Sequence, residues 1–316
     1  MLSRTTILVA LMVTAFAVGS GAVPKLTFDP SAEEIFVTKG VAKQPTVYSV
    51  NRRNLSEEDL NGKLAVLKNH GFVASNRVSK EGKVLLTNTK EDMYLTYESE
   101  SGKYQFYRRN ATGLAATESS DRKGLESVAK GYLRDLLGQD AANYVFENTE
   151  EEWEVLRSDP EKRLRTITYR YVRVVEGRRV LGVDCHALLT LGEGRRLTAV
   201  EIANPVLTKE FGVGRWVKNN SMKGHLAEYL NGPEYAKDGS GRKLTLLQTD
   251  VIRGSESYFR VVRNGRTFLE PHMSFMCQDK TADGETLTRE IHLSVDPSRL
   301  PNVAEEDIMD LSPKSR

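Results

Sequence analysis

Apolar residues recur at helical spacing in three separate stretches of the chain, and each stretch has its own start and stop residues. In the first, Ser56 and Asp59 form a capping-box pattern ahead of the apolar positions, and Gly71 follows as a stop signal. The other two stretches also begin at capping residues and end at glycine. The pattern therefore predicts three amphipathic helices, over residues 56–71, 120–138 and 220–233.

After each predicted helix the apolar period changes from about 3.6 to about 2 residues, which is typical of strands. The longest such segment runs from Thr166 to Val175. Glu176-Gly177 and Asn264-Gly265 have the composition of two-residue hairpin turns. The strands predicted in this way cover residues 93–97, 104–106, 166–175, 180–191, 196–202, 258–262, 267–277 and 286–295.

The second and third helix-plus-strand blocks also match in sequence. The segment from Tyr171 to Arg178 aligns with the segment from Tyr258 to Arg266, with one extra residue in the turn. This match predicts a duplicated unit, a helix followed by a curved antiparallel sheet. Chance similarity between two amphipathic hairpins is the alternative.

We therefore predict an α+β fold of tandem cystatin-like units, each a helix packed on a curved antiparallel sheet. The predicted segments are a signal peptide at 1–22, an N-terminal helix-plus-strands unit at 23–112, a unit at 121–205, a second similar unit at 216–297, and a mobile tail at 298–316. The connectors 111–120 and 204–219 have loop-like composition.

The second block is similar to the PepSY and fungalysin/thermolysin propeptide group of cystatin-like secreted domains. The resemblance covers residues 125–205 and consists of spaced glycines and apolar positions. The matching residues are Tyr171, Arg173, Val175, Gly177, Val180, Gly182, Gly194 and Leu197. In that group the domain usually precedes a metallopeptidase, but none follows here. The resemblance therefore implies a binding or inhibitory module rather than a zymogen.

The first residues have the three parts of an export signal. Arg4 supplies the positive charge, an apolar run extends from Ile7 to Val18, and small residues precede Val23. We predict cleavage before Val23, a secreted or periplasmic protein, and no membrane association after cleavage. An uncleaved anchor is the alternative, although the run is shorter than the roughly 20 residues that span a bilayer.

Composition limits the partners. The formal net charge is +2 and 28% of residues are charged, which gives no reason to expect nucleic acid. Two cysteines, Cys185 and Cys277, are too few for a disulfide-stapled scaffold. They form a candidate disulfide, since both are predicted in corresponding strands and export permits oxidation; two separate buried thiols are the alternative.

Local signatures of catalysis are missing from the sequence. A zinc peptidase needs two histidines one helical turn apart, and His225, with Glu228 nearby, lacks the second histidine. In Asp184-Cys185-His186, neighbouring strand residues point to opposite faces, so Cys185 and His186 cannot form a thiolate–imidazole pair. We expect His186 at the surface. We predict no catalytic residues, no metal and no cofactor.

An arginine-rich stretch between Arg157 and Arg196 follows an acidic run between Glu147 and Glu154. Both stretches fit the solvated face of a sheet. The alternative is a surface that docks an anionic partner through bidentate arginine contacts. The candidate binding residues are Arg165, Arg170, Arg173, Arg178 and Arg179.

Taken together, these patterns favour a secreted, non-catalytic binding protein. Its expected partner is a protein, with a secreted peptidase as the class that the resemblance suggests. An extracytoplasmic enzyme without local motifs and a structural protein of the envelope are the alternatives.

Overall fold

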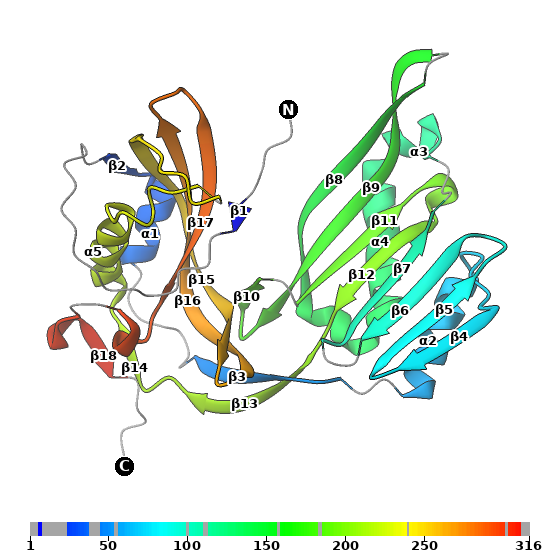
Figure 1. Ribbon diagram of the computed structural model, residues 1–316, viewed down its shortest axis with the longest axis horizontal. Coiled ribbons are helices and arrows are strands. Elements are labelled where there is room, and N and C mark those ends of the chain that lie inside the picture. The colour runs from blue at the N-terminus through cyan, green and yellow to red at the C-terminus, as the bar shows by residue number, and fades with distance from the viewer. Residues whose placement is uncertain are drawn as a thin grey trace. The chain divides into compact units, whose positions relative to one another are not determined.

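The chain divides into two compact units (Figure 1). Unit 1 consists of Met1–Tyr48, Lys209–Val261 and Leu269–Arg316, and unit 2 of Ser49–Thr208 and Val262–Phe268. The computed structural model describes residues 6–7, 24–37, 45–53, 56–98, 101–109, 113–156, 159–182, 185–238, 240–300 and 303–310. The predicted cleavage point before Val23 lies outside these residues.

Unit 2 is built on an antiparallel sheet with the strand order β8-β9-β11-β12-β7-β6-β5-β4. β10 also pairs with the end of β9. The strands are β4 (Asn76–Lys80), β5 (Lys83–Asn88), β6 (Met93–Glu98), β7 (Lys103–Arg108), β8 (Tyr144–Leu156), β9 (Asp159–Val175), β10 (Arg178–Leu181), β11 (His186–Leu191) and β12 (Leu197–Ala203).

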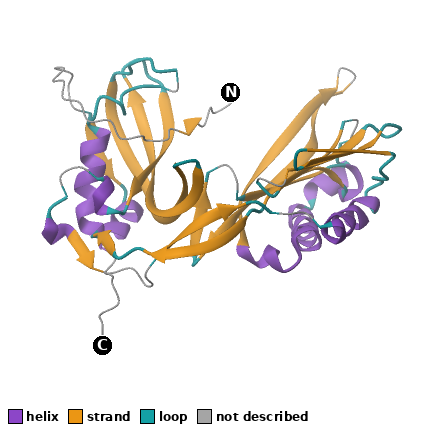
Figure 2. Ribbon diagram, turned by 60° about the horizontal axis from the view of Figure 1, so that its bottom comes forward, coloured by secondary structure: helices purple, strands orange, loops and turns teal. Residues whose placement is uncertain are grey.

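The helices of unit 2 lie together on one side of this sheet (Figure 2). They are α2 (Glu57–Lys68), α3 (Ala116–Ser120) and α4 (Arg122–Leu137), with short 3-10 turns at Gly138–Asn143 and Glu193–Arg195. Ser56 caps α2 in the predicted capping box with Asp59. Asp121 caps α4 by accepting from the Gly124 amide at 2.9 Å, and Gly138 ends it at a φ of 58°. Both helix predictions are confirmed.

One hydrophobic cluster fills the space between these helices and the sheet. Leu67 of α2 and Leu125 of α4 are both fully buried in it, together with strand residues such as Leu189. Because α2 and α4 share this cluster, their apolar faces are covered by one common sheet rather than by a separate sheet each.

Unit 1 combines the two ends of the chain. Its main strands are β15 (Leu246–Arg263), β16 (Arg266–Thr281) and β17 (Thr286–Ser294), with β2 (Lys25–Phe28) parallel to β15 and β1 (Thr6–Ile7) parallel to β17. The other elements are α1 (Pro30–Val37), β14 (Arg215–Val217), α5 (Asn219–Leu230), β18 (Ile308–Asp310) and 3-10 turns at Pro297–Arg299 and Glu305–Asp307. The unit boundaries at Tyr48 and Thr208 fall within β3 (Thr46–Asn51) and β13 (Val206–Gly212).

The core of unit 1 joins α1, α5 and the sheet. Phe36 of α1 stacks on Phe275 of β16 with ring centroids 5.6 Å apart, and Leu226 of α5 is fully buried in the same cluster. The third predicted helix is confirmed as α5, whereas α1 was not predicted. Among the described residues, no helix is long and apolar enough to cross a membrane.

The predicted fold class, an α+β chain of tandem cystatin-like units, is wrong. Strands far outnumber helices and join into large sheets of mixed direction, rather than repeating as one helix on its own small sheet. The physical reason is edge pairing. β7 and β12, from different predicted units, pair from Ala199–Tyr107 to Ala203–Lys103 and continue one sheet.

The compact units also cut across the predicted segments. Residues 24–37, placed in an N-terminal unit by sequence, belong to unit 1, where β2 pairs with β15. The connector 204–219 contains β13 and β14. Part of the predicted tail is ordered, because β18 pairs with β14 and aligns Met309 with Trp216.

Candidate functional site

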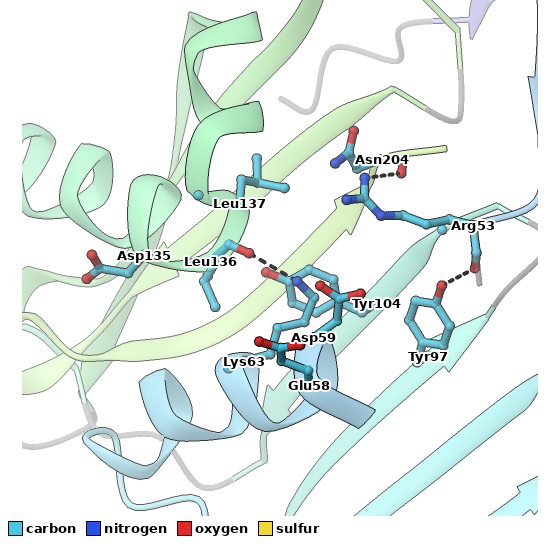
Figure 3. Close-up of a pocket in the computed structure, with 13 residues that line it drawn as sticks. Arg53, Glu58, Asp59, Lys63, Tyr97, Tyr104, Asp135, Leu136, Leu137 and Asn204 are labelled. Carbon is cyan, nitrogen blue, oxygen red and sulfur yellow. Dashed lines mark hydrogen bonds between the residues drawn. The ribbon is translucent and has the colours of Figure 1, made fainter. Parts of the chain in front are cut away.

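A cavity of about 220 Å³ lies in unit 2 beside α2, the end of α4 and the β6–β7 turn (Figure 3). It is lined by Arg53, Glu58, Asp59, Gly62, Lys63, Tyr97, Gly102, Tyr104, Asp135, Leu136, Leu137, Gly138 and Asn204. Two cations, three carboxylates and two phenols therefore line this cavity, which makes it a candidate site for ligand binding or catalysis.

Lys63 is the central charge of this cavity. Its ammonium donates to the carbonyl of Leu136 at 3.1 Å and lies 4.9 Å above the ring of Tyr104 (Figure 3). Burial, together with the nearby positive charge of Arg53, lowers the pKa of Lys63. Leu136 is in the last turn of α4, where unpaired carbonyls carry partial negative charge. Lys63 thus caps the C-terminus of α4 from the neighbouring helix.

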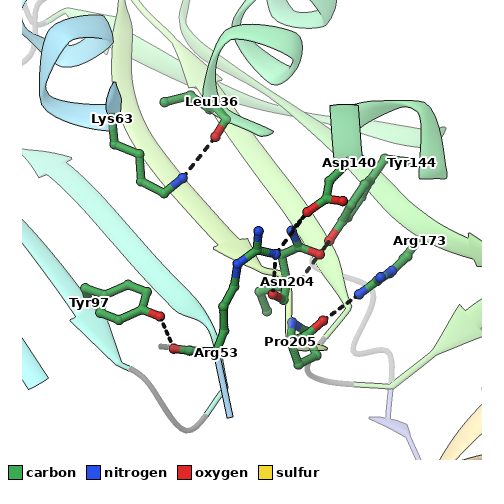
Figure 4. Close-up of polar contacts among 10 residues, drawn as sticks. Arg53, Lys63, Tyr97, Leu136, Asp140, Tyr144, Arg173, Asn204 and Pro205 are labelled. Carbon is green, nitrogen blue, oxygen red and sulfur yellow. Dashed lines mark hydrogen bonds and ion pairs between the residues drawn. The ribbon is translucent and has the colours of Figure 1, made fainter. Parts of the chain in front are cut away.

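Arg53 is held by a second polar group (Figure 4). Its guanidinium donates to Asp140 at 2.9 Å and to the carbonyl of Asn204 at 3.2 Å, and the Asn204 amide donates to Asp140 at 2.7 Å. Burial opposes ionisation of Asp140, but the hydrogen bonds from Asn204 and Arg53 outweigh it and lower its pKa. The Tyr144 hydroxyl completes the group by donating to the Ala203 carbonyl at 3.0 Å.

Gly102 shows how closely the chain approaches this group. Its φ is 59°, and a Cβ at this position would lie 2.6 Å from the carbonyl oxygen of Asn204. Only glycine fits both the backbone conformation and the space. The polar residues of the cavity therefore fasten α2, α4 and the end of β12 to one another. The cavity volume is also below the roughly 300 Å³ at which ligand sites begin.

The face of the unit 2 sheet opposite the helices carries a second group of residues. The register aligns Thr190, Ala199, Tyr107, Tyr94 and Thr87 in a row across five strands. The rings of Tyr94 and Tyr107 stack 5.6 Å apart, and Tyr107 is 46% exposed.

A neighbouring row includes Leu188, Glu201, Gln105, Thr96, Leu85 and Val78. Leu85 is 38% and Val78 53% exposed. We call these two rows the open face.

Glu201 is the polar centre of the open face. It accepts from Lys103 at 2.8 Å and from Gln105 at 2.6 Å, and lies 3.0 Å from the ring nitrogen Nε2 of His186. Burial opposes its ionisation, but these partners hold its pKa at about 2. His186 is only 6% exposed, so its predicted surface position is wrong. Burial lowers the pKa of His186 even though Glu201 acts to raise it.

The five candidate arginines do not gather at one site. Three of them form ion pairs with the acidic strand β8: Arg165 with Glu152 at 3.3 Å, and Arg170 and Arg179 with Glu147 at 2.7 and 3.7 Å. Arg173 donates to the carbonyl of Pro205 at 2.8 Å, and Arg178 is 7% exposed. The acidic and basic stretches of the sequence therefore largely compensate each other as adjacent strands.

Cys185 and Cys277 are both buried. Cys185 lies in a bend before β11 rather than in the strand where we predicted it, and Cys277 lies in β16. Burial, with a smaller effect of Asp279, raises the pKa of Cys277 to about 12. A thiol that stays protonated reacts slowly. The disulfide stays a prediction. His225 is half-buried on α5, and the described part of the chain holds no group of three or more metal-ligating side chains.

Unit 1 contains a buried polar network that the sequence did not suggest. Asp279, fully buried, accepts from Arg289 at 2.9 Å, from the Tyr235 hydroxyl at 2.8 Å and from Thr249 at 2.6 Å. A second polar pair joins the hydroxyl of the buried Ser274 to the half-buried His292 at 2.8 Å. Their residues are scattered through strands without a motif, so only the pairing of strands reveals them.

Comparison with known proteins gives a fold but no family. No family model matches the chain, and no curated protein matches it. Among solved structures, an uncharacterized protein from Eubacterium rectale is similar over 82% of this chain and 86% of that one, with a TM-score of 0.50 and 10% identity. This similarity concerns the fold alone.

Proposed function

We propose that this protein is a non-catalytic, extracytoplasmic binding protein that docks another folded protein on the open face of unit 2. The observation that carries the proposal is the asymmetry of the sheet. One face is covered by α2 and α4, whereas the other exposes Tyr107, Leu85 and Val78 in adjacent rows. Exposed tyrosine and aliphatic side chains beside polar groups are typical of protein interfaces.

The polar part of the face favours a protein over a small ligand. Glu201 already has partners in Lys103, Gln105 and His186, so the centre carries little uncompensated charge. The surface is also a broad sheet face, whereas small-molecule sites are concave. The stacked Tyr94 and Tyr107 rings offer a rigid apolar anchor of the kind that dominates binding energy in such interfaces.

Site-specific photo-crosslinking in the organism of origin tests the proposal. A photoreactive residue at position 107 should give one discrete adduct with another protein, and the same residue at exposed Val73, outside the open face, should not. Thr96→Arg, placed in the middle of the face, should remove the adduct while the thermal midpoint stays unchanged. An adduct of twice the chain mass, or equal labelling from both positions, would contradict the proposal.

A secreted peptidase is the partner class that we put forward first, from the sequence resemblance. Incubation with such peptidases should give stoichiometric inhibition without turnover of this protein. The Thr96→Arg variant should not inhibit. Cleavage of the protein with no loss of peptidase activity would exclude this class and leave other protein partners.

A further inference from the structure

We propose that the free edge of β4 takes up an extended segment of the partner protein as an added strand, with a glutamate side chain of that segment seated between β4 and the start of α2. The inference rests on the proposed function, because the partner supplies the segment. It adds a mode of recognition, a place on the fold and a sequence preference.

The first observation is that β4 ends the sheet of unit 2. Among the described strands, β5 is its only partner. The β4–β5 hairpin closes through Glu81 and Gly82, both at positive φ, so Lys80 and Lys83 face each other next to a two-residue turn. Hydrogen-bonded and non-bonded pairs alternate along an antiparallel ladder. This alternation directs the backbone N–H and C=O groups of Arg77 and Ser79 toward the free edge.

The second observation is a groove of about 480 Å³ beside this edge. Its lining includes the half-buried Val84, the nearly buried Leu60 and Tyr97, and Arg77 and Ser79 of β4 itself. The register places Arg77 and Ser79 opposite Leu86 and Val84, on the same side of the sheet as the helices. A strand added to β4 would therefore place alternate side chains in this groove. Charged residues on an edge strand can serve only to prevent aggregation, but that role does not require a groove beside the strand.

Arg77 identifies the occupant. Lys80 and Lys83 of the same hairpin pair with Glu81 and Glu98, whereas Arg77 pairs with the exposed Glu57, whose place an incoming carboxylate can take. The opposite edge of the same sheet, β8, carries five glutamates instead. Glutamate suits the groove because its methylene groups can contact the apolar lining while its carboxylate reaches Arg77.

The chain already shows this contact with its own residue. Glu57, at the first turn of α2, pairs with both terminal nitrogens of Arg77 at 2.6 and 3.0 Å. Glu57 is 67% exposed and Arg77 is 44% exposed, so the pair is accessible. An incoming glutamate would replace Glu57 on Arg77. Between such groove residues, the segment would place apolar side chains next to Val78 and Leu85, which continue the open face.

The test uses the full protein and a short capped peptide of alternating valine and glutamate, with a lysine-for-glutamate peptide as control. Binding of the glutamate peptide should slow amide exchange at Arg77 and Ser79. Ser79→Pro should abolish binding, because it removes an N–H that points to the edge, and Ser79→Ala should preserve it. Arg77→Gln should weaken binding about tenfold, and Glu57→Gln should strengthen it severalfold.

Several results would overturn the inference: equal binding of both peptides, unchanged binding by Ser79→Pro, or no effect of Glu57→Gln. If Ser79→Pro fails to fold, the opposite effects of Arg77→Gln and Glu57→Gln decide the matter. Loss of peptide binding with a retained adduct from position 107 would refute strand addition and leave the proposed function standing. Peptide binding without the adduct from position 107 would refute the proposed function and leave strand addition standing.

Discussion

The two compact units differ in the kinds of residues that they bury. Unit 2 buries an apolar cluster under α2 and α4, and has ion pairs on its surface, as in Arg165 with Glu152. Unit 1 places a charged pair, Asp279 with Arg289, inside the unit. Both units bury an apolar cluster, but unit 1 must in addition satisfy a buried ion pair, so the loss of a charged partner should cost unit 1 more than unit 2.

The largest effect is expected at the buried charge of unit 1. Asp279→Asn should lower the free energy of unfolding of unit 1 by about 3–5 kcal/mol, because Arg289 is left buried without its counter-charge. Urea unfolding followed by Trp216 fluorescence in a Trp153→Phe background measures this, since Trp216 is fully buried in unit 1. Glu285→Gln, at the exposed turn nearby, is the control. An equal effect of both variants would show that the pair is not decisive.

The apolar core of unit 2 gives the next effect. Leu125→Ala removes a fully buried side chain and should cost about 2–5 kcal/mol. Because α2 and α4 share one core, amide exchange should speed up in residues 57–68 and 122–137 together. Lys130→Ala, on the exposed side of α4, should change neither. Faster amide exchange confined to α4 would contradict a core shared by α2 and α4.

Acid should weaken both units, through the buried His70 in unit 2 and the half-buried His292 in unit 1. Burial lowers the pKa of His70 in unit 2 and of His292 in unit 1 from 6.5 to about 4. Between these values the unfolded chain binds more protons, so the stabilisation present above pH 6.5 is lost as the pH falls toward 4. Each histidine should cost about 2 kcal/mol at pH 5 relative to pH 7.

His70→Asn checks this in unit 2, because the asparagine oxygen can still accept from the Leu197 amide, as His70 does at 3.1 Å. The variant should lose less stability than the natural chain between pH 7 and pH 5. His292→Asn serves the same purpose in unit 1. Parallel pH profiles of variant and natural protein would exclude these histidines as the cause.

The smallest effect is expected for the surface ion pairs. Arg165→Gln should change the stability of unit 2 by about 0.5 kcal/mol, since exposed pairs contribute little. A double-mutant cycle with Glu152→Gln measures the coupling. A coupling energy well above about 1 kcal/mol would show that surface ion pairs also stabilise unit 2, and would contradict the difference between the two units.

Local structure followed closely from the sequence. The capping box at Ser56 and the stop at Gly138 placed α2 and α4, because caps act within a few residues of the helix they end. The turns at Glu176-Gly177 and Asn264-Gly265 were also found, and all four residues have positive φ between 49° and 80°. These signals depend on neighbours in the chain alone.

Other elements were missed because their local pattern is ambiguous. The acidic run fits the solvated face of a sheet, but no strand is predicted over β8, since five glutamates hide its alternation. Its strand character comes from β9, whose arginines Arg165 and Arg170 offset the charge. The predicted strand over 180–191 divides at Gly182, where a φ of 107° interrupts the extended chain between β10 and β11.

The sequence by itself determined the helices, the hairpin turns and most strands, because caps, glycines and apolar periods are read from adjacent residues. Only the tertiary structure decided which edges join, as β7 and β12 do, and that residues 24–37 belong with the C-terminal strands. It alone assembled Asp279 with Arg289, the open face around Tyr107, and the groove beside Arg77. The backbone groups at the edge of a strand offer the same hydrogen bonds whatever the side chains are. The pairing of strands that are far apart in the sequence therefore depends on how the whole core is buried.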